Sequence, residues 1–194
     1  MTTGDVVPLR PVEAAPWDGF EYFRAGEEEK ALGLFQLVDE AGQPVDPRAL
    51  GWLDAELGRR LFRGMLTIRV MDQRLMALQR QGRVGFYGEA LGQEAAVVGS
   101  AAALEPQDWL VPALREAGAG IFRGMSMASY IAQIFGSSAD VTKGRQLPCH
   151  PCDKERHYVV MSSCVGSQIP HAVGIAMAMK IRGERGACCF GYMG

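Results

Sequence analysis

The chain has 194 residues, and its 20 lysines and arginines against 22 aspartates and glutamates give a formal net charge of −2. With 48% hydrophobic and 22% charged residues, the composition is that of an ordinary globular protein, which excludes disorder along the whole chain. A pI near 5.9 argues against a nucleic-acid-binding protein, which normally carries a basic surface. No run of about eighteen apolar residues is present, so no membrane-spanning helix is expected.

The amino-terminal residues and the cysteines predict a cellular compartment. Residues 1–19 lack the apolar core of a secretory signal, so secretion is not expected. The five cysteines are an odd number and lie partly within apolar runs, which is typical of free thiols in a reducing environment. We therefore expect a cytoplasmic protein.

The amino-terminal part of the sequence predicts an arm, a short hairpin and a long helix. Residues 1–45 contain the arm, rich in proline and acidic residues, and then a strand at 34–38 followed by a turn at 39–42. An aspartate and a proline at positions 46 and 47 suit the start of a helix. Apolar residues then recur at helical spacing up to residue 81, where Gly82 is expected to end the helix.

Short helices and short strands alternate in the rest of the chain. The pattern predicts helices over 89–104, up to 123, over 126–135 and over 168–180, and strands over 109–111, 158–161 and from 187 onward. Between the third of these helices and the second strand lies the longest loop, residues 137–157, and loops of that length are commonly functional. Such alternation is typical of a parallel sheet, so we predict an α/β fold with helices on both faces of the sheet.

A pair of cysteines, Cys149 and Cys152, lies in the long loop with the spacing of a redox pair or of half a zinc site. A redox pair normally begins a helix, whereas prolines flank this one. His157 and Cys164 are the remaining candidates for zinc ligands, and no second paired motif is present. Incidental loop cysteines are the favoured interpretation.

Three glycines, Gly118, Gly120 and Gly124, invite comparison with a dinucleotide-binding loop. Their spacing is GxGxxxG rather than GxGxxG, and the segment has a helical pattern instead of following a well-formed strand. The motif therefore predicts dinucleotide binding only weakly.

Polar groups follow two of the predicted strands. Arg115 comes just after the strand at 109–111, and residues 162–168 link the strand at 158–161 to a helix. Ligands of open α/β sheets bind at the carboxyl ends of the strands, where an arginine suits a diphosphate and a helix amino terminus suits an anion. Taken one by one, each site is equally well explained as a polar cap; their equivalent positions favour a ligand site.

Several unrelated strings resemble one family in the order in which the family has them. They are QRQGRVGFYGEALGQEAAVVGSAAALEPQDW, LREAG, KGRQLPCH and SSCVGSQIPHAVGIAMAMK, and together they cover roughly residues 34–190. These strings resemble the alpha subunit of the thiamine diphosphate-dependent 2-oxo acid dehydrogenases. FQLVDEAGQPV and QRQGR are most similar to the branched-chain group, the 3-methyl-2-oxobutanoate dehydrogenases.

The resemblance implies a set of binding residues. The residues expected to contact the cofactor are Arg115, Leu114, Ser163 and Val165, with Leu114 standing where relatives usually have tyrosine. The residues expected to hold a potassium ion are Ser163, Cys164, Ser167 and Gln168, with Cys164 where relatives often have proline. No catalytic residue of the family falls within this sequence, so none is assigned.

The resemblance also implies the fold and its extent. Residues 46–194 correspond to the amino-terminal part of a thiamine diphosphate-binding dehydrogenase domain, so the fold is expected to be incomplete at its carboxyl end. The family's magnesium motif carries a carboxylate where this sequence has Tyr192. A phenol is a poor ligand for a hard cation, so this chain alone is expected to be inactive.

The implied activity is oxidative decarboxylation of branched-chain 2-oxo acids with acyl transfer to lipoyl groups. Thiamine diphosphate, magnesium and potassium are the implied cofactors. A beta subunit, in an α2β2 tetramer, and a lipoyl-bearing acyltransferase core are the implied partners. Two alternatives stay open: a non-catalytic, truncated fragment of that subunit, and a thiol or zinc module built on Cys149 and Cys152.

Overall fold

The computed structural model describes residues 39, 41–44, 51 and 54–193. Of these residues, those up to Arg60 belong to one compact unit and those from Leu61 onward to another. The predicted arm and the strand expected at 34–38 lie outside the described residues. None of the helices in the described part of the chain is both long and apolar enough to cross a membrane.

The first unit contains the turn predicted at 39–42. Oδ1 of Asp39 accepts hydrogen bonds from the backbone N–H groups of Ala41 and Gln43, at 2.9 and 2.8 Å. Gly42 has a φ of 77°, a conformation that glycine adopts without strain. The short side chain of an aspartate that bonds to the following backbone stabilises such a turn, as the sequence predicts.

Helix α2 (Ala55–Arg80) begins later than predicted. The start predicted at position 46 lies outside the described residues, but Gly51 lies in a turn and Asp54 precedes α2, so the prediction of one uninterrupted helix up to residue 81 is wrong. Oδ1 of Asp54 accepts from the N–H of Leu57 at 2.7 Å, which satisfies one of the free donors of the first turn. The helix ends where expected, just before Gly82 at a φ of 71°.

Two short strands form a parallel pair at the centre of the second unit. Strand β1 (Trp109–Val111) pairs with β2 (Cys189–Gly191) in the register Trp109–Cys189 and Val111–Gly191. Tyr158 forms a parallel bridge with Leu110, so β1 lies between β2 and the segment around Tyr158. The strand predicted over 158–161 is therefore reduced to isolated bridges at Tyr158, this one and an antiparallel one to Asp153.

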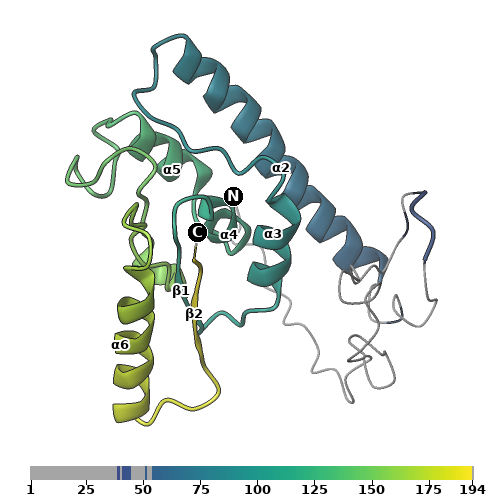
Figure 1. Cartoon of the computed structure of the whole chain (residues 1–194), viewed down its shortest axis with the longest axis vertical. Coiled ribbons are helices and arrows are strands. Elements are labelled where there is room, and N and C mark those ends of the chain that lie inside the picture. Colours follow the sequence, from purple (N-terminus) through teal and green to yellow (C-terminus); the bar gives the residue numbers. More distant parts are fainter. Residues whose placement is uncertain (1–38, 40, 45–50, 52–53, 194) are drawn as a thin grey trace, which may run out of the picture. The chain divides into compact units, whose positions relative to one another are not determined.

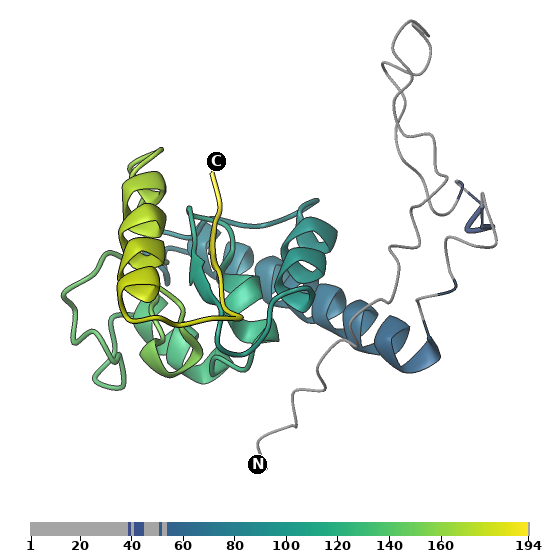
Figure 2. The same cartoon turned by 90° about the horizontal axis from the view of Figure 1, so that it is seen from below.

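The remaining helices surround this sheet. They are α3 (Glu94–Ala102), α4 (Ala117–Phe122), α5 (Met127–Ile134), the single 3-10 turn η2 (Lys154–Arg156) and α6 (Gln168–Ile181). Figures 1 and 2 show α6 on one side of the two strands and α3 with α2 on the other. Leu110 of β1 shares a buried core with Ile68 of α2 and Val98 of α3. The predicted α/β fold with helices on both faces of a parallel sheet is confirmed.

The glycines of α4 serve close packing. A β-carbon at Gly118 would lie 2.3 Å from Cδ1 of Ile68, and one at Gly120 would lie 2.9 Å from Cε of Met125. Gly124, at a φ of 100°, follows the end of the helix. These glycines therefore let α4 approach its neighbours inside the core, which explains their spacing without a dinucleotide.

Candidate cofactor-binding site

The turn after β1 presents Arg115 at the carboxyl end of the strand. Glu116 is buried, and its Oε2 accepts hydrogen bonds from the N–H groups of Ala113 and Arg115, at 2.9 and 3.1 Å. Burial raises the pKa of this carboxyl group, and the backbone N–H donors oppose that rise. Glu116 thus shapes the turn, while the Arg115 side chain remains exposed and donates from Nη1 to the carbonyl oxygen of Glu89.

A loop at residues 85–91 lies beside this turn and is anchored from the core. Asp72 of α2 is buried, and it accepts hydrogen bonds from the hydroxyl of Tyr87 and, at 2.7 Å, from the N–H of Ala90. Burial raises the pKa of Asp72 and that of Tyr87. A β-carbon at Gly88 in this loop would lie 3.8 Å from Cδ2 of Leu114, so the leucine side chain is next to the loop. The arginine and the leucine predicted to contact the cofactor are therefore supported by one fixed loop.

The turn at 162–168 places several oxygen atoms close together at the start of α6. The carbonyl oxygen of Ser162 accepts from Nε2 of Gln168 at 2.8 Å, and the hydroxyls of Ser162 and Ser167 are 2.9 Å apart. Gln168 is 2% exposed, and its Oε1 has no hydrogen-bond partner among the described residues. The carbonyl oxygen of Cys164 accepts from the N–H of Ser167 at 3.1 Å. An unpartnered buried amide oxygen fits a cation that supplies the missing contact.

Ser162 joins this group although it is not among the potassium ligands that the resemblance implies. The predicted set contained Ser163, but the hydroxyl of Ser163 lies 2.5 Å from Nε2 of His150 instead. For two adjacent serines before a helix, the sequence does not indicate which hydroxyl bonds within the turn and which bonds to another part of the chain. His150 was not selected as a site residue either, although it lies in the long loop at 137–157 and ends the string KGRQLPCH.

Val165 lies at the tip of the same turn and is 80% exposed. A valine in so exposed a position has no packing role within the described residues. A single exposed valine is ordinary on a protein surface, so its exposure alone assigns no contact to Val165.

Tyr192 follows β2 at the same edge of the sheet. Its hydroxyl lies 2.6 Å from Oγ of Ser100, and its ring packs edge-to-face on Phe190 with the centroids 4.9 Å apart. Burial raises the pKa of Tyr192, which keeps the phenol neutral. A neutral phenol that is already hydrogen-bonded does not fit a magnesium ligand.

The two cysteines of the long loop differ in environment. Cys149 is fully buried, with its Sγ 3.5 Å from the carbonyl oxygen of Phe86, and Cys152 is partly buried. Burial raises the pKa of both thiols, which disfavours the thiolate needed for zinc binding and thiol exchange. No group of three or more histidine, cysteine, aspartate or glutamate side chains suited to a metal occurs in the described residues.

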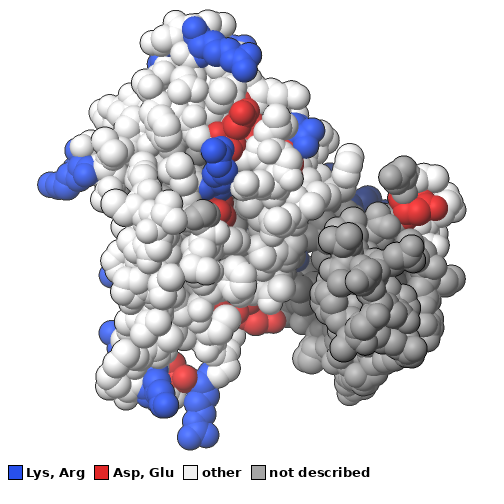
Figure 3. Space-filling view, in the orientation of Figure 1, with Lys and Arg blue, Asp and Glu red and all other residues white. Residues whose placement is uncertain are grey.

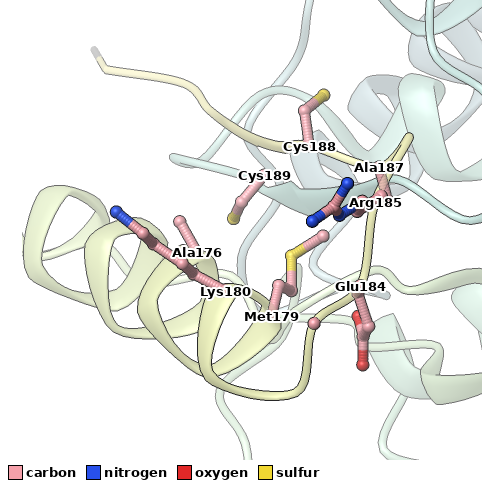
Figure 4. A pocket seen from close by; sticks show the side chains of 9 residues that line it. Ala176, Met179, Lys180, Glu184, Arg185, Ala187, Cys188 and Cys189 are labelled. Atoms are coloured by element: carbon pink, nitrogen blue, oxygen red, sulfur yellow. The ribbon is translucent and has the colours of Figure 1, made fainter.

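A pocket is present at the opposite end of β2. It lies between the carboxyl-terminal half of α6 and the segment that leads into β2, and Lys180, Arg185 and Cys189 are among its lining residues (Figure 4). Because this is the amino end of the strand, the pocket is separate from the groups that follow the carboxyl ends of the strands. It does not contain any of the predicted site residues.

Three relatives of known name are similar to most of this chain. The alpha subunit of the mitochondrial 2-oxoisovalerate dehydrogenase of Caenorhabditis elegans is 36% identical over 168 residues, which is 87% of this chain and 39% of that protein. For the alpha subunit 2 of Arabidopsis thaliana the identity is 33%, over 89% of this chain and 36% of the relative. For the human alpha subunit it is 40%, over 77% and 34%. The chain thus spans little more than a third of the length of these relatives.

The names of these relatives correct one expectation. All three are described as mitochondrial proteins, so the prediction of a cytoplasmic protein is wrong. The prediction rested on the lack of a secretory signal core and on unpaired cysteines. Neither feature distinguishes the cytosol from an organelle.

The match to a family extends over most of the second unit. The family of the dehydrogenase E1 component matches residues 62–194, which include β1, β2, the turn that carries Arg115 and the turn before α6. The predicted resemblance to the alpha subunits of branched-chain 2-oxo acid dehydrogenases is confirmed by the identities of 33–40%. The chain belongs to the dehydrogenase E1 component family.

Proposed function

We propose that this chain acts as the alpha subunit in the oxidative decarboxylation of branched-chain 2-oxo acids, and that it anchors the diphosphate of thiamine diphosphate. The observation that carries the proposal is the position of two polar turns. Arg115 follows β1, and residues 162–168 follow the segment of Tyr158, which pairs with β1 in parallel. Both turns therefore lie at one edge of the sheet, where α/β folds bind phosphorylated ligands.

The diphosphate contacts are assigned to groups that have hydrogen-bond donors available. The guanidinium of Arg115 is exposed and suits two phosphate oxygens at once. The backbone N–H groups of Val165 and Gly166 have no acceptor in the described part of the chain, and they lie at the start of α6, where the helix dipole favours an anion. Leu114 and Val165 would contribute apolar contacts, and Ser163 would contribute through its backbone.

We assign a potassium ion to the oxygen atoms of the turn at 162–168. Oε1 of Gln168, the hydroxyl of Ser167 and the carbonyl oxygen of Cys164 are neutral oxygen ligands in one short turn, together with Ser162 or Ser163. The unpartnered Oε1 of Gln168 supports the assignment, because a buried amide oxygen without a partner is costly unless something binds it. The ion would fix the turn in the conformation that directs its N–H groups outward.

Magnesium does not fit the described residues in the same way. Tyr192 stands where the resemblance implies a carboxylate, and its hydroxyl is bonded to Ser100. No step of the proposal is therefore assigned to a magnesium ion held by this chain.

The bound cofactor would supply the electron sink for loss of carbon dioxide from the 2-oxo acid. The residues of this chain hold and orient the diphosphate end through Arg115 and the turn at 162–168. The apolar side chains of Leu114 and Val165 exclude water from it. The acyl product would pass to the lipoyl group of an acyltransferase core.

A beta subunit is the partner that we propose for α6. Four apolar residues, Ile169, Val173, Met177 and Ile181, recur every fourth position on this helix and are all more than half exposed. Figure 3 shows that the face bearing α6 is largely uncharged, with lysines and arginines mostly near its edges. A contiguous apolar helix face of this kind is typical of a surface that another subunit covers, as in the proposed α2β2 tetramer.

Titration calorimetry with thiamine diphosphate tests the proposal on the chain assembled with its beta subunit. Arg115→Met is expected to weaken binding by about ten- to a hundredfold, because a charged hydrogen-bond donor contributes roughly 1.5–3 kcal/mol. Arg185→Met is the matched control, since Arg185 lines the pocket at the other end of β2, and it is expected to leave the affinity unchanged. Equal affinities of the Arg115 variant and the original protein would contradict the assignment.

A further inference from the structure

A buried histidine lies directly behind an exposed serine of the cofactor turn. His150 is 5% exposed, whereas Ser163 is exposed, and Nε2 of the imidazole lies 2.5 Å from the serine hydroxyl. The two residues come from separate parts of the chain, the long loop at 137–157 and the turn before α6. This hydrogen bond therefore links the loop to the turn.

The other ring nitrogen of His150 determines which atom donates. Nδ1 lies 2.9 Å from the carbonyl oxygen of Pro148. A carbonyl oxygen only accepts, so in the neutral ring Nδ1 carries the hydrogen and Nε2 is left as an acceptor. The hydroxyl of Ser163 must then donate its single hydrogen to Nε2. That hydrogen is directed into the protein and is not available to a diphosphate oxygen.

The backbone that carries His150 is held on both sides. The carbonyl oxygen of Leu147 accepts from the N–H of His150 at 3.2 Å and from Nε2 of Gln133 on α5 at 2.6 Å. On the other side, the carbonyl oxygen of Pro151 accepts from the N–H of Met161 at 3.2 Å, and Met161 immediately precedes the turn. With its backbone held in this way and its Nδ1 bonded to Pro148, the imidazole is able to fix the residue that bonds to Nε2.

We propose that His150 is a positioning residue that holds the turn at 162–168 in its binding conformation by accepting the hydroxyl hydrogen of Ser163. The serine side chain is then a structural link, and the anion contact is made by the backbone N–H groups of the turn. This inference rests on the proposed function, because it concerns the same diphosphate site. It assigns roles to His150 and to the Ser163 hydroxyl that differ from direct contact with the cofactor.

A double-mutant cycle separates positioning from direct contact. His150→Leu and Ser163→Ala each remove the same hydrogen bond, so each is expected to weaken binding of thiamine diphosphate by about tenfold. The double variant is expected to bind no more weakly than either single variant, since the bond is lost only once. In the assembled enzyme, His150→Leu should raise the KM for the cofactor by a much larger factor than it lowers kcat.

Two further variants exclude a merely structural effect. His150→Gln keeps a polar group within reach of Ser163 and is expected to restore most of the affinity. His157→Asn removes an imidazole that stacks on Trp109, at 4.7 Å between centroids, and does not contact Ser163. Asparagine tolerates the left-handed backbone at position 157, so this control is expected to lower the unfolding temperature without changing the affinity.

The possible results distinguish this inference from the proposed function. Additive losses in the cycle, or a Ser163→Ala loss much larger than that of His150→Leu, would overturn the positioning role and favour direct contact by the serine. An original protein that binds no thiamine diphosphate would overturn the proposed function and this inference with it. Nitrogen-15 NMR of the histidine rings supplies a readout without cofactor: His150 should carry its hydrogen on Nδ1, and Ser163→Ala should shift the resonance of Nε2.

Discussion

The buried carboxylate of Glu94 forms an ion pair with Arg69 on α2. Arg69 donates to Oε1 of Glu94, and the N–H of Gly92 donates to Oε2 at 3.0 Å. The hydrogen bond from Arg69 lowers the pKa of Glu94 below its ordinary value of 4.5. A lowered carboxylate pKa stabilises the fold above that ordinary value, and the stabilisation is lost as the pH falls through it.

Arg69→Met is therefore expected to lower the free energy of unfolding at neutral pH, because it leaves Glu94 buried beside a neutral side chain. It should also reduce the loss of stability that the original protein shows as the pH falls below the ordinary carboxyl pKa of 4.5. Urea unfolding at several pH values measures both effects. Arg74→Met, which changes an exposed arginine of the same helix, is the control. An unchanged acid dependence in the Arg69 variant would show that the pair contributes nothing.

Because Tyr192 stands where the resemblance implies a magnesium ligand, we expect the affinity for thiamine diphosphate to be nearly independent of magnesium. Its phenol is bonded to Ser100, so removing magnesium with a chelator is expected to change the affinity of the original protein for thiamine diphosphate very little. Tyr192→Asp places a carboxylate after β2 and should make binding depend on magnesium, since hard cations prefer carboxylate oxygens. Tyr192→Phe removes only the hydroxyl and should stay independent of the metal. Calorimetry with and without chelator decides this, and a strong magnesium dependence of the original protein would refute it.

At the scale of elements, the close packing of α4 against α2 requires a glycine at position 118. A β-carbon at Gly118 would meet Cδ1 and Cγ1 of the buried Ile68 at 2.3 and 2.8 Å. Gly118→Ala is expected to lower the free energy of unfolding by about 1–3 kcal/mol, the usual cost of overpacking a core. Gly99→Ala on α3 is the matched control, because nothing lies within 4 Å of its β-carbon position and alanine favours a helix. Chemical denaturation that gives both variants the same stability would contradict this packing.

The sequence predicted those elements whose signals are local. The cap of α5 is one example, since Ser126 accepts from the N–H of Ser129 at 3.3 Å as expected. The start of α2 was misplaced because two Asp-containing segments, at positions 46 and 54, both offer a cap. The strand at 158–161 is reduced to a bridge because its pairing depends on the distant Leu110.

In the site, too, the sequence predicted the residues with local signals and missed those that depend on tertiary contacts. Arg115 and the turn at 162–168 were selected from their positions after strands, and that reasoning requires only the order of the elements. Their supporting residues, Glu116 and His150, act through hydrogen bonds that depend on tertiary structure. No spacing rule in the sequence pairs His150 with Ser163, because the long loop between them has no regular period.

At the scale of the molecule, the site is one edge of a small parallel sheet with helices on both sides. The exposed apolar row on α6 lies outside this edge, on the helix that follows the turn at 162–168. The central claim is that this edge recognises a diphosphate. Arg115 and the N–H groups before α6 would bind that group, whatever the rest of the ligand contacts.

The most direct test compares thiamine diphosphate with thiamine by titration calorimetry on the chain assembled with its beta subunit. Three charge-assisted contacts, from Arg115 and the N–H groups of Val165 and Gly166, are available only to the diphosphate. Even two of them, at roughly 1.5 kcal/mol each, predict that thiamine diphosphate binds at least about a hundredfold more tightly than thiamine. Arg115→Met should reduce this ratio. Equal affinities for the two compounds would contradict the account.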